Sequence, residues 1–162
     1  MKIDGKPSLI YGYTTHPDRT VVDATAPWGD PQAIHDSVNL MIQAASDNHY
    51  YGPFGLYIAQ SQFGQTRQRY TDGSGQIVRK TLREIDELTF VKGSSFLESG
   101  EATLVCLDHD CVDIAIAQDI IPTEWEERGG FVVKFKVWAV MVPRIKSDSN
   151  GNSGIVHCRG TA

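Results

Sequence analysis

The side chains best suited to bind a metal or catalyse a reaction are concentrated in the segment LDHDCVD at 107–113. Carboxylate, imidazole and thiolate groups are all metal ligands, but a site needs them to converge from fixed positions. In an extended segment the side chains of His109 and Cys111 point to one side, and those of Asp108 and Asp110 point to the other. The pattern therefore predicts a solvated turn between two strands.

The dipeptide His157-Cys158 is the other place where such a site could find ligands or a nucleophile. A nucleophilic cysteine needs a positioned base and an activating environment, which adjacency in sequence does not provide. A terminal strand is the simpler interpretation. A small metal-binding or hydrolytic domain centred on Asp108–Asp113 stays open as an alternative. Apart from this alternative, the sequence predicts no catalytic residue, no bound metal and no cofactor.

Two further segments resemble chemical sites only superficially. The carboxylates near residue 125 are neighbours on one strand or turn, so they diverge and do not flank a cleft as paired acid and base would. They are Asp119, Glu124, Glu126 and Glu127. The segment TDGSGQ at 71–76 lacks the lysine and the spacing of a phosphate-binding loop. It predicts a flexible connection between two helices.

The composition is that of one soluble globular domain. The chain has 162 residues, 41% hydrophobic and 22% charged, with a net charge of −5. No basic run is present, which argues against sequence-specific nucleic-acid binding. No apolar run approaches the roughly 20 residues that span a bilayer, so no membrane partner is expected. The cysteines Cys106, Cys111 and Cys158 form no CxxC motif, and reduced thiols in a cytoplasmic protein are expected.

Local signals define the first helix and the strand that follows it. Asp30 can cap a helix that starts with Pro31, and apolar residues then recur at helical spacing up to Ala45. Phe54–Ala59 is apolar throughout, which suits a strand buried on both faces. A second helix, capped by Ser61, is expected to end near Arg69 and Tyr70. A third is expected over Gln76–Leu88, with Ile77, Leu82 and Ile85 facing inward.

The second half of the chain is rich in strand patterns. Strands are predicted over Phe90–Leu97, Ala102–Leu107 and Val112–Ile121, and a last short one over GIVHCRG. In the segment 131–142, one face carries Phe131, Val133, Phe135, Val137, Ala139 and Met141, and the other carries Lys134, Lys136 and Trp138. This predicts a half-buried strand that Pro143 ends. The expected fold is α/β (α+β), a mixed, mainly antiparallel sheet flanked by three helices. Its expected parts are an irregular or β opening segment (1–30), an α/β domain (31–145) and a flexible tail (146–162).

The order of residues from Tyr50 to Gly93 resembles the axial domain of tailed-phage major capsid proteins and of encapsulin shell proteins, which share the Hong Kong 97-type capsid fold. In that family a GP-[FY]-x-L-[YV] strand runs into a helix, and a Tyr/Arg-rich segment with a DG turn follows. Here these are GPFGLY at 52–57 and TRQRYTDG at 66–73. The opening GYTTHP at 12–17, followed by TVVDAT and Trp28, also resembles the family.

The resemblance implies a structural shell protein with no enzymatic activity. It implies a virion capsid assembled in the bacterial cytoplasm, with the chain itself as partner in pentamers, hexamers or larger shells. An encapsulin shell that encloses cargo proteins is the alternative within this class. A binding module that uses the aromatics of Tyr50–Tyr57 is a third possibility. The family places an N-terminal arm, a long hairpin loop and a spine helix ahead of this region, so the chain resembles the C-terminal half, with the axial domain and part of the peripheral domain.

The resemblance also implies two groups of site residues. The loop expected to line a pore at a symmetry axis is Thr71, Asp72, Gly73, Ser74 and Gly75. Charged and aromatic residues on and around the two short helices are expected to contact neighbouring subunits in a ring. These are Arg67, Arg69, Tyr70, Arg79, Arg83, Asp86 and Glu87.

Overall fold

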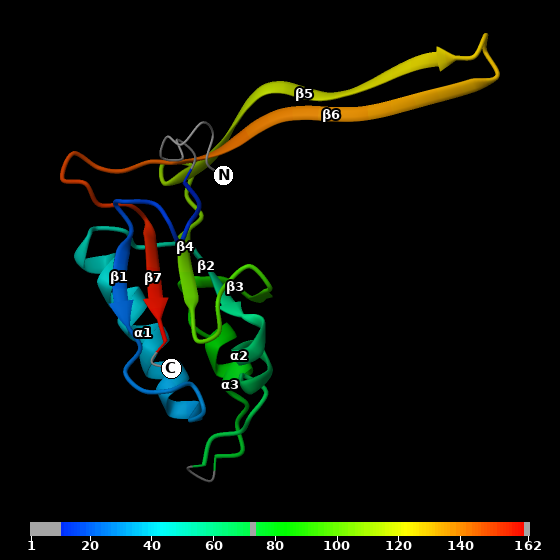
Figure 1. The fold of residues 1–162 in the computed structure, drawn as a ribbon. Coiled ribbons are helices and arrows are strands. Elements are labelled where there is room, and N and C mark those ends of the chain that lie inside the picture. Colours follow the sequence, from blue (N-terminus) through cyan, green and yellow to red (C-terminus); the bar gives the residue numbers. More distant parts are fainter. Residues whose placement is uncertain (1–10, 72–73, 161–162) are drawn as a thin grey trace. The chain divides into compact units, whose positions relative to one another are not determined.

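The computed structural model describes residues 11–71 and 74–160 (Figure 1), and it divides into two compact units. The first unit contains the chain up to Val112 and again from Ile145, and the second is Asp113–Arg144. This division cuts the chain at places other than the expected segments 1–30, 31–145 and 146–162. The reason is that strands from both ends of the chain pair with each other in the first unit.

A mixed five-stranded sheet forms the first unit. Two neighbouring pairs, β1 with β7 and β2 with β3, are parallel, and the pairs β2 with β4 and β4 with β7 are antiparallel. The strand order is β1-β7-β4-β2-β3. The strands are β1 (Thr20–Asp23), β2 (Phe54–Ala59), β3 (Leu88–Ser94), β4 (Ala102–Cys106) and β7 (Ile155–Arg159). The expected mixed α+β fold is confirmed, as is the last short strand.

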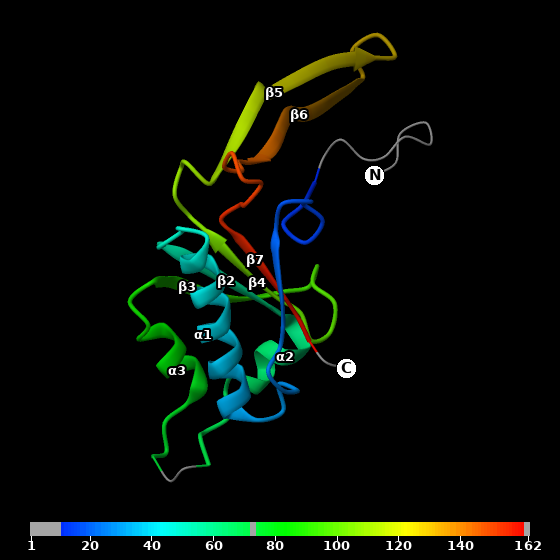
Figure 2. The same cartoon turned by 90° about the vertical axis from the view of Figure 1, so that its left-hand side faces the viewer.

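Helix α1 (Pro31–Asp47) begins and ends where the sequence predicts. The Asp30 carboxylate accepts a hydrogen bond from the Gln32 amide at 3.2 Å, and Pro31 occupies the first turn, where it costs no hydrogen bond. The apolar stripe of the helix is buried against the sheet, with Ile34, Val38 and Met41 fully covered. Figures 1 and 2 show α1 and α3 on the same side of the sheet.

Strand β2 is an interior strand of this sheet, between β4 and β3, and its bounds match the prediction. Because it has a hydrogen-bonded neighbour on each edge and covered faces, only apolar side chains and glycine fit its positions. Gly55 packs closely against Phe90, because a Cβ at this position would overlap the Phe90 ring. The glycine therefore permits close packing of β2 and β3.

The two short helices differ from their predicted bounds. Helix α2 (Gln60–Gln65) follows β2 directly, so Ala59 occupies the cap position and Ser61 is not the cap. Helix α3 (Val78–Arg83) is shorter than the predicted 76–88. Ile77, predicted to face inward, is 39% exposed, because it adopts an extended conformation and pairs with Arg69.

Val78 takes the buried position in α3 instead, together with the correctly predicted Leu82. Leu88 is buried as a strand residue, because it starts β3 opposite Phe54 of β2. Ile85, between helix and strand, packs partly buried against the same core. The core of this unit thus joins α1, α3 and one face of the sheet.

The second unit is a β-hairpin of β5 (Val112–Glu127) and β6 (Val132–Ile145). Its turn contains three successive residues with positive φ, Arg128 at 53°, Gly129 at 68° and Gly130 at 90°. The two glycines adopt this left-handed backbone without steric cost. Pro143 does not end the strand, because an edge strand tolerates a residue without an amide hydrogen.

One face of the hairpin is mostly apolar, and the other mixes charged side chains with Ile121, Trp125 and Trp138. Side-chain contacts join Asp113 to Arg144, Thr123 to Trp138, and Glu127 to Lys134. Alternation then places the apolar residues on the opposite face, as predicted for β6. The predicted half-burial is wrong for the described residues, because six large apolar side chains of this face are 53–77% exposed. They are Ile114, Ile116, Ile120, Val133, Phe135 and Val137.

Candidate functional site

A short antiparallel stem between α2 and α3 carries the loop that the sequence predicts at a symmetry axis. Arg69 and Ile77 form an isolated bridge, and the Tyr70 amide donates to the Gln76 carbonyl at 3.0 Å. The Val78 amide donates to the Gln68 carbonyl at 3.1 Å, which closes the base of the stem. Figures 1 and 2 show that the two sides of this stem extend beyond α2 and α3.

Three of the predicted loop residues are described, and they adjoin this stem. Thr71, Ser74 and Gly75 are exposed, whereas Asp72 and Gly73 lie outside the described residues. The Ser74 hydroxyl accepts a hydrogen bond from the Gln76 amide at 3.3 Å. Gly75 has a φ of +67°, so the return of the chain into the stem uses a conformation that favours glycine.

Arg79, one of the predicted subunit-contact residues, binds within its own chain. Its Nη2 donates to the Phe63 carbonyl at 2.9 Å, and its Nε donates to Thr66 Oγ1 at 3.1 Å. The guanidinium also lies 4.0 Å from the centre of the Phe63 ring. Burial lowers the pKa of Arg79, and the neighbouring Arg67 and Arg83 act in the same direction. Arg79 therefore fastens α3 to the end of α2.

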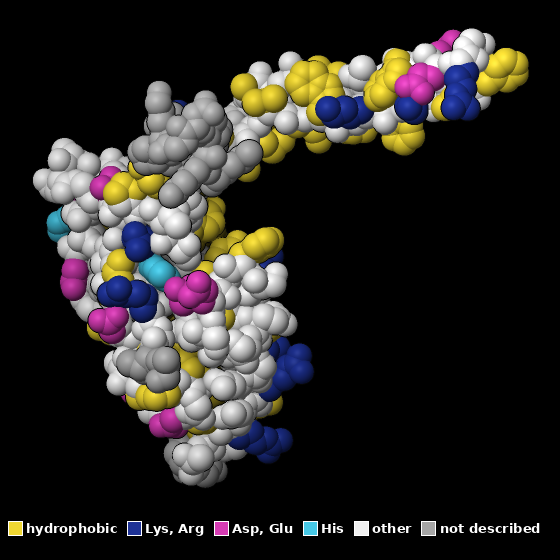
Figure 3. Space-filling model, in the orientation of Figure 1, with side chains coloured by type: hydrophobic (Ala, Val, Ile, Leu, Met, Phe, Trp, Pro, Cys, Tyr) yellow, Lys and Arg dark blue, Asp and Glu magenta, His cyan; other side chains and the backbone are white. Residues whose placement is uncertain are grey.

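The other predicted contact residues are mostly at the surface. Tyr70 is half-buried and packs against the core. The exposed members of the set are Arg67, Arg69, Arg83, Asp86 and Glu87. Basic side chains stand out over the part of the unit that carries α2 and α3 (Figure 3). The stem and its flanks thus present charges of both signs to solvent.

The segment 107–113 is a hydrogen-bonded turn followed by the start of β5. The amides of Cys111 and Val112 donate to the Asp108 carbonyl at 2.9 and 3.1 Å. Asp108, His109 and Asp110 are exposed, while Cys111 points into the core. Within residues 11–71 and 74–160, no three His, Cys, Asp or Glu side chains lie close enough together to hold a metal. The predicted turn between two strands is confirmed.

The cysteines are free, buried thiols. The Cys111 thiol donates to Cys106 Sγ at 2.9 Å, and burial raises the pKa of Cys111 to about 12, with the Cys106 contact adding to the effect. Burial also raises the pKa of Cys158 to about 11. Because a nucleophile or metal ligand must be a thiolate, Cys111 and Cys158 are poorly suited to be catalytic nucleophiles or metal ligands, and their thiols react slowly at neutral pH.

His157 and Cys158 do not act as a pair, because successive strand residues point to opposite faces. Cys158 lies in the core, whereas His157 lies on the other face of the sheet beside Arg19 and Glu101. Arg19 Nε donates to His157 Nδ1 at 3.4 Å, and Glu101 Oε1 lies 3.3 Å from Nε2. Burial lowers the pKa of His157, although Glu101 opposes this. The sequence gives no signal for this three-residue cluster, because its members meet only through strand pairing.

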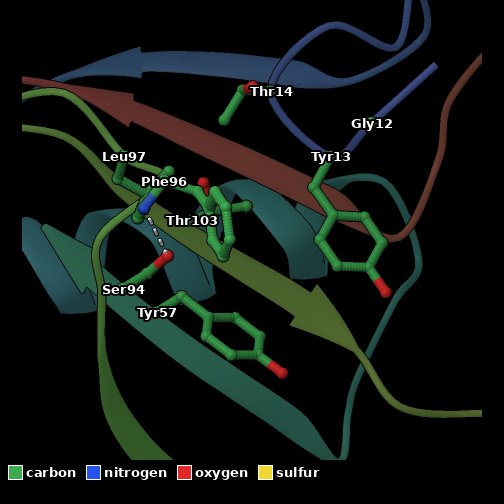
Figure 4. Close-up of a pocket in the computed structure, with 8 residues that line it drawn as sticks. All are labelled: Gly12, Tyr13, Thr14, Tyr57, Ser94, Phe96, Leu97 and Thr103. Carbon is green, nitrogen blue, oxygen red and sulfur yellow. Dashed lines mark hydrogen bonds between the residues drawn. The ribbon is translucent and has the colours of Figure 1, made fainter.

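A pocket of about 370 Å³ lies in the first unit, between the opening segment, the sheet and the loop after β3. Figure 4 shows Tyr13 from the opening segment and Tyr57 from β2 with their rings on the same side. The Ser94 hydroxyl accepts a hydrogen bond from the Phe96 amide at 3.2 Å.

The aromatic residues of the segment 50–57 lie in different surroundings. The Tyr50 hydroxyl donates to the Asn152 carbonyl at 3.0 Å, and Phe54 is buried. The Tyr50–Tyr57 aromatics therefore do not form one ligand-binding patch.

The fold has counterparts among solved structures of viral shells. A virus-like particle protein from Pyrococcus furiosus matches 91% of the chain with a TM-score of 0.72 at 20% identity. The capsid protein of Myoviridae phage XM1 matches 88% of the chain with a TM-score of 0.70 at 11% identity. A chain from Mycobacterium phage Che8 matches 87% with a TM-score of 0.60 at 9% identity.

The chain shares the fold of the virus-like particle protein and the phage capsid protein. It spans 58%, 51% and 53% of the lengths of the three matched chains, in the same order. No family model matches the sequence, and no curated protein matches it either. Among the described residues, no helix has the length and apolar character needed to cross a membrane.

Proposed function

We propose that this chain is a structural shell protein, the major capsid protein of a tailed phage or prophage, or a piece of one, which assembles with copies of itself. The observation that carries the proposal is the shared fold over 91% and 88% of the chain with a virus-like particle protein and a phage capsid protein. Because one fold can serve several functions, the fold alone does not establish a shell function, and the surface of the chain must also suit subunit contacts. Two surfaces of the chain support this function.

The first supporting surface is the charged stem between α2 and α3. A ring of identical subunits uses a heterologous interface, in which one face of each subunit contacts a different face of the next. Arg67, Arg69 and Arg83 are exposed, as are Asp86 and Glu87 after α3, so this region has charges of both signs available for such contacts. In this proposal the loop at 71–75 lies near the five-fold or six-fold axis of the ring, and Arg79 positions α3 from within.

The second supporting surface is the apolar face of the β5–β6 hairpin. An isolated two-stranded hairpin is marginally stable in water, and a row of half-exposed apolar side chains is typical of an interaction surface. Side chains that are 53–77% exposed lose that contact with water when a neighbouring subunit covers them. We assign this face to subunit contacts in the assembled shell.

The proposal places the chain in the virion, with no enzymatic activity and no cofactor. An encapsulin shell is the alternative within the same class, and it differs in carrying cargo proteins on its inner surface. The metal-binding or hydrolytic alternative gains no support from the divergent side chains of 107–113 and 157–158.

Electron microscopy of the purified chain over a range of concentrations tests the proposal. Rings with five-fold or six-fold symmetry, or closed particles, are the expected result. A metal assay on the same sample separates the alternatives. Single subunits at every concentration, with one bound zinc or iron per chain, would contradict the shell assignment and favour a metal-binding domain.

A further inference from the structure

Two buried cysteines lie in direct contact at the end of β4. Cys106 is the last residue of that strand, and Cys111 follows the turn at 107–110. Their sulfur atoms are 2.9 Å apart, and the two residues are only 2% and 6% exposed. A disulfide bond requires a sulfur–sulfur distance of about 2.05 Å, so the two atoms need to approach by less than about 1 Å.

The backbone on both sides of the pair is fixed by hydrogen bonds. The Cys106 amide donates to the Gly154 carbonyl at 2.7 Å, and the Cys111 amide donates to the Asp108 carbonyl at 2.9 Å. The Cys111 carbonyl in turn accepts from the Lys146 amide at 2.9 Å. The two side chains are therefore held facing each other.

Gly154 makes room for the two sulfur atoms. A Cβ at this position would lie 2.7 Å from Cys106 Cβ and 3.1 Å from Cys111 Sγ. Any larger residue would thus displace the pair. The close approach of the two thiols is built into three separate segments of the chain, namely the end of β4, the turn after it and the start of β7.

We propose that Cys106 and Cys111 form a site of oxidative modification, at which a small disulfide such as oxidised glutathione converts the two thiols into an intrachain disulfide. In the first step the thiolate of one cysteine attacks the small disulfide and expels one glutathione thiolate. In the second, the other cysteine thiolate attacks the protein sulfur of the mixed disulfide and expels the second glutathione. The protein loses two hydrogens, and one oxidised glutathione becomes two reduced molecules.

Cys158 does not compete for this bond. It is opposite Ala102 in the β4–β7 pairing, four residues along β4 from Cys106. At about 3.3 Å per strand residue, this separation exceeds the reach of a disulfide. Cys158 is therefore an internal control within the same molecule.

The bond would join the end of β4 to the residue that precedes β5. It restricts the unfolded chain and so raises the stability of the folded one. Because Cys106 and Cys111 are buried, the end of β4 must open locally before the small disulfide reaches a thiol, and that thiol must ionise. The reaction is therefore slow at neutral pH and faster as the pH rises. The expected consequence is an oxidised form that melts a few degrees higher than the reduced form.

Peptide mapping tests the proposal directly. The full chain is incubated with oxidised glutathione, quenched with acid, unfolded, alkylated and digested with trypsin. Peptide 93–128 contains both cysteines, and peptide 147–159 contains Cys158. Peptide 93–128 should be two hydrogens lighter and resist alkylation until it is reduced, while Cys158 is alkylated. Two alkyl groups on 93–128, or a glutathione retained on it, would overturn the proposal.

A matched pair of variants provides the control. Cys158→Ser should leave both the linked peptide and the oxidation-dependent rise in melting temperature unchanged. Cys111→Ser should abolish both, and oxidised and reduced samples should then melt together. A Cys111→Ser variant that retains the rise would contradict the assignment. The wild-type peptide map decides the question if that variant does not fold.

Discussion

The guanidinium of Arg79 lies 4.0 Å from the centre of the Phe63 ring, and its Nη2 donates to the carbonyl of the same residue at 2.9 Å. This contact holds α3 against the end of α2. Replacing Arg79 with alanine should lower the free energy of unfolding by about 1–2 kcal/mol, because bonds to a charged donor are lost. Arg79→Lys should recover only part of this, since lysine lacks the planar group that forms the bonds and stacks on the ring. Urea unfolding measures the free energy of unfolding of both variants. A value for Arg79→Ala equal to that of the wild type would show that the contact does not contribute to stability.

Gly154→Ala should destabilise the chain by about 1–3 kcal/mol, since the new methyl group would press on Cys106 and Cys111. Gly64→Ala is the matched control, because a Cβ there meets nothing within 4 Å and alanine is the better helix former. It should be neutral or slightly stabilising. Thermal unfolding gives the melting temperatures of the two variants. Equal changes in melting temperature would contradict the close packing of Gly154 against the two thiols.

His157 should make stability depend on pH between about 5 and 7. Burial lowers its pKa from the ordinary 6.5, Arg19 and Arg159 lower it further, and Glu101 opposes them. The neutral imidazole therefore stabilises the fold above pH 6.5. As the pH falls through this value the unfolded chain binds the proton first, and stability decreases until the folded group also titrates.

Urea unfolding of the wild type and of His157→Asn at pH 7.5, 6.5 and 5.5 isolates this effect from that of the carboxylates. The variant should be less stable throughout but should lose less stability between pH 7.5 and 5.5. Equal losses of stability in the two proteins would show that His157 does not cause the pH dependence.

A charge reversal at Arg69 tests the proposed contact between subunits at the stem. Arg69→Glu should weaken self-association, and added salt should reduce the difference from the wild type, since exposed charges are screened. Asp36→Lys reverses a charge on the exposed side of α1 and should leave association unchanged. Sedimentation velocity at two salt concentrations measures both variants. An Arg69→Glu variant that associates like the wild type would remove the stem from the interface.

The sequence correctly predicted the elements whose bounds depend on neighbouring residues, such as helix α1 and strand β2. Asp30 and Pro31 define the start of α1 by capping alone, and the continuous apolar run of β2 specifies a strand covered on both faces. Alternation in β6 likewise gave the correct two faces of the hairpin. These signals depend on neighbouring residues, so they remain visible in a single sequence.

The sequence-based predictions were wrong where contacts between residues far apart in the sequence determine the structure. The pattern at 76–88 is helical, but pairing of Ile77 with Arg69 and of Leu88 with Phe54 removes both ends of the helix. Alternation in 131–142 shows which residues share a face and does not show whether anything covers it. For the same reason the contact of Arg79 with Phe63, and the cluster of His157 with Arg19 and Glu101, have no sequence signal.

We expect this chain to self-associate, with the apolar face of the hairpin in the interface. The most direct test is the mass in solution, by light scattering coupled to size exclusion, of the wild type, Phe135→Asp and Lys136→Gln. Phe135 lies on the apolar face and Lys136 on the opposite one. Pentamers, hexamers or larger particles are expected for the wild type and Lys136→Gln, and smaller species for Phe135→Asp. A wild type that stays a single subunit at all concentrations, or a Phe135→Asp variant that assembles like it, would contradict the claim.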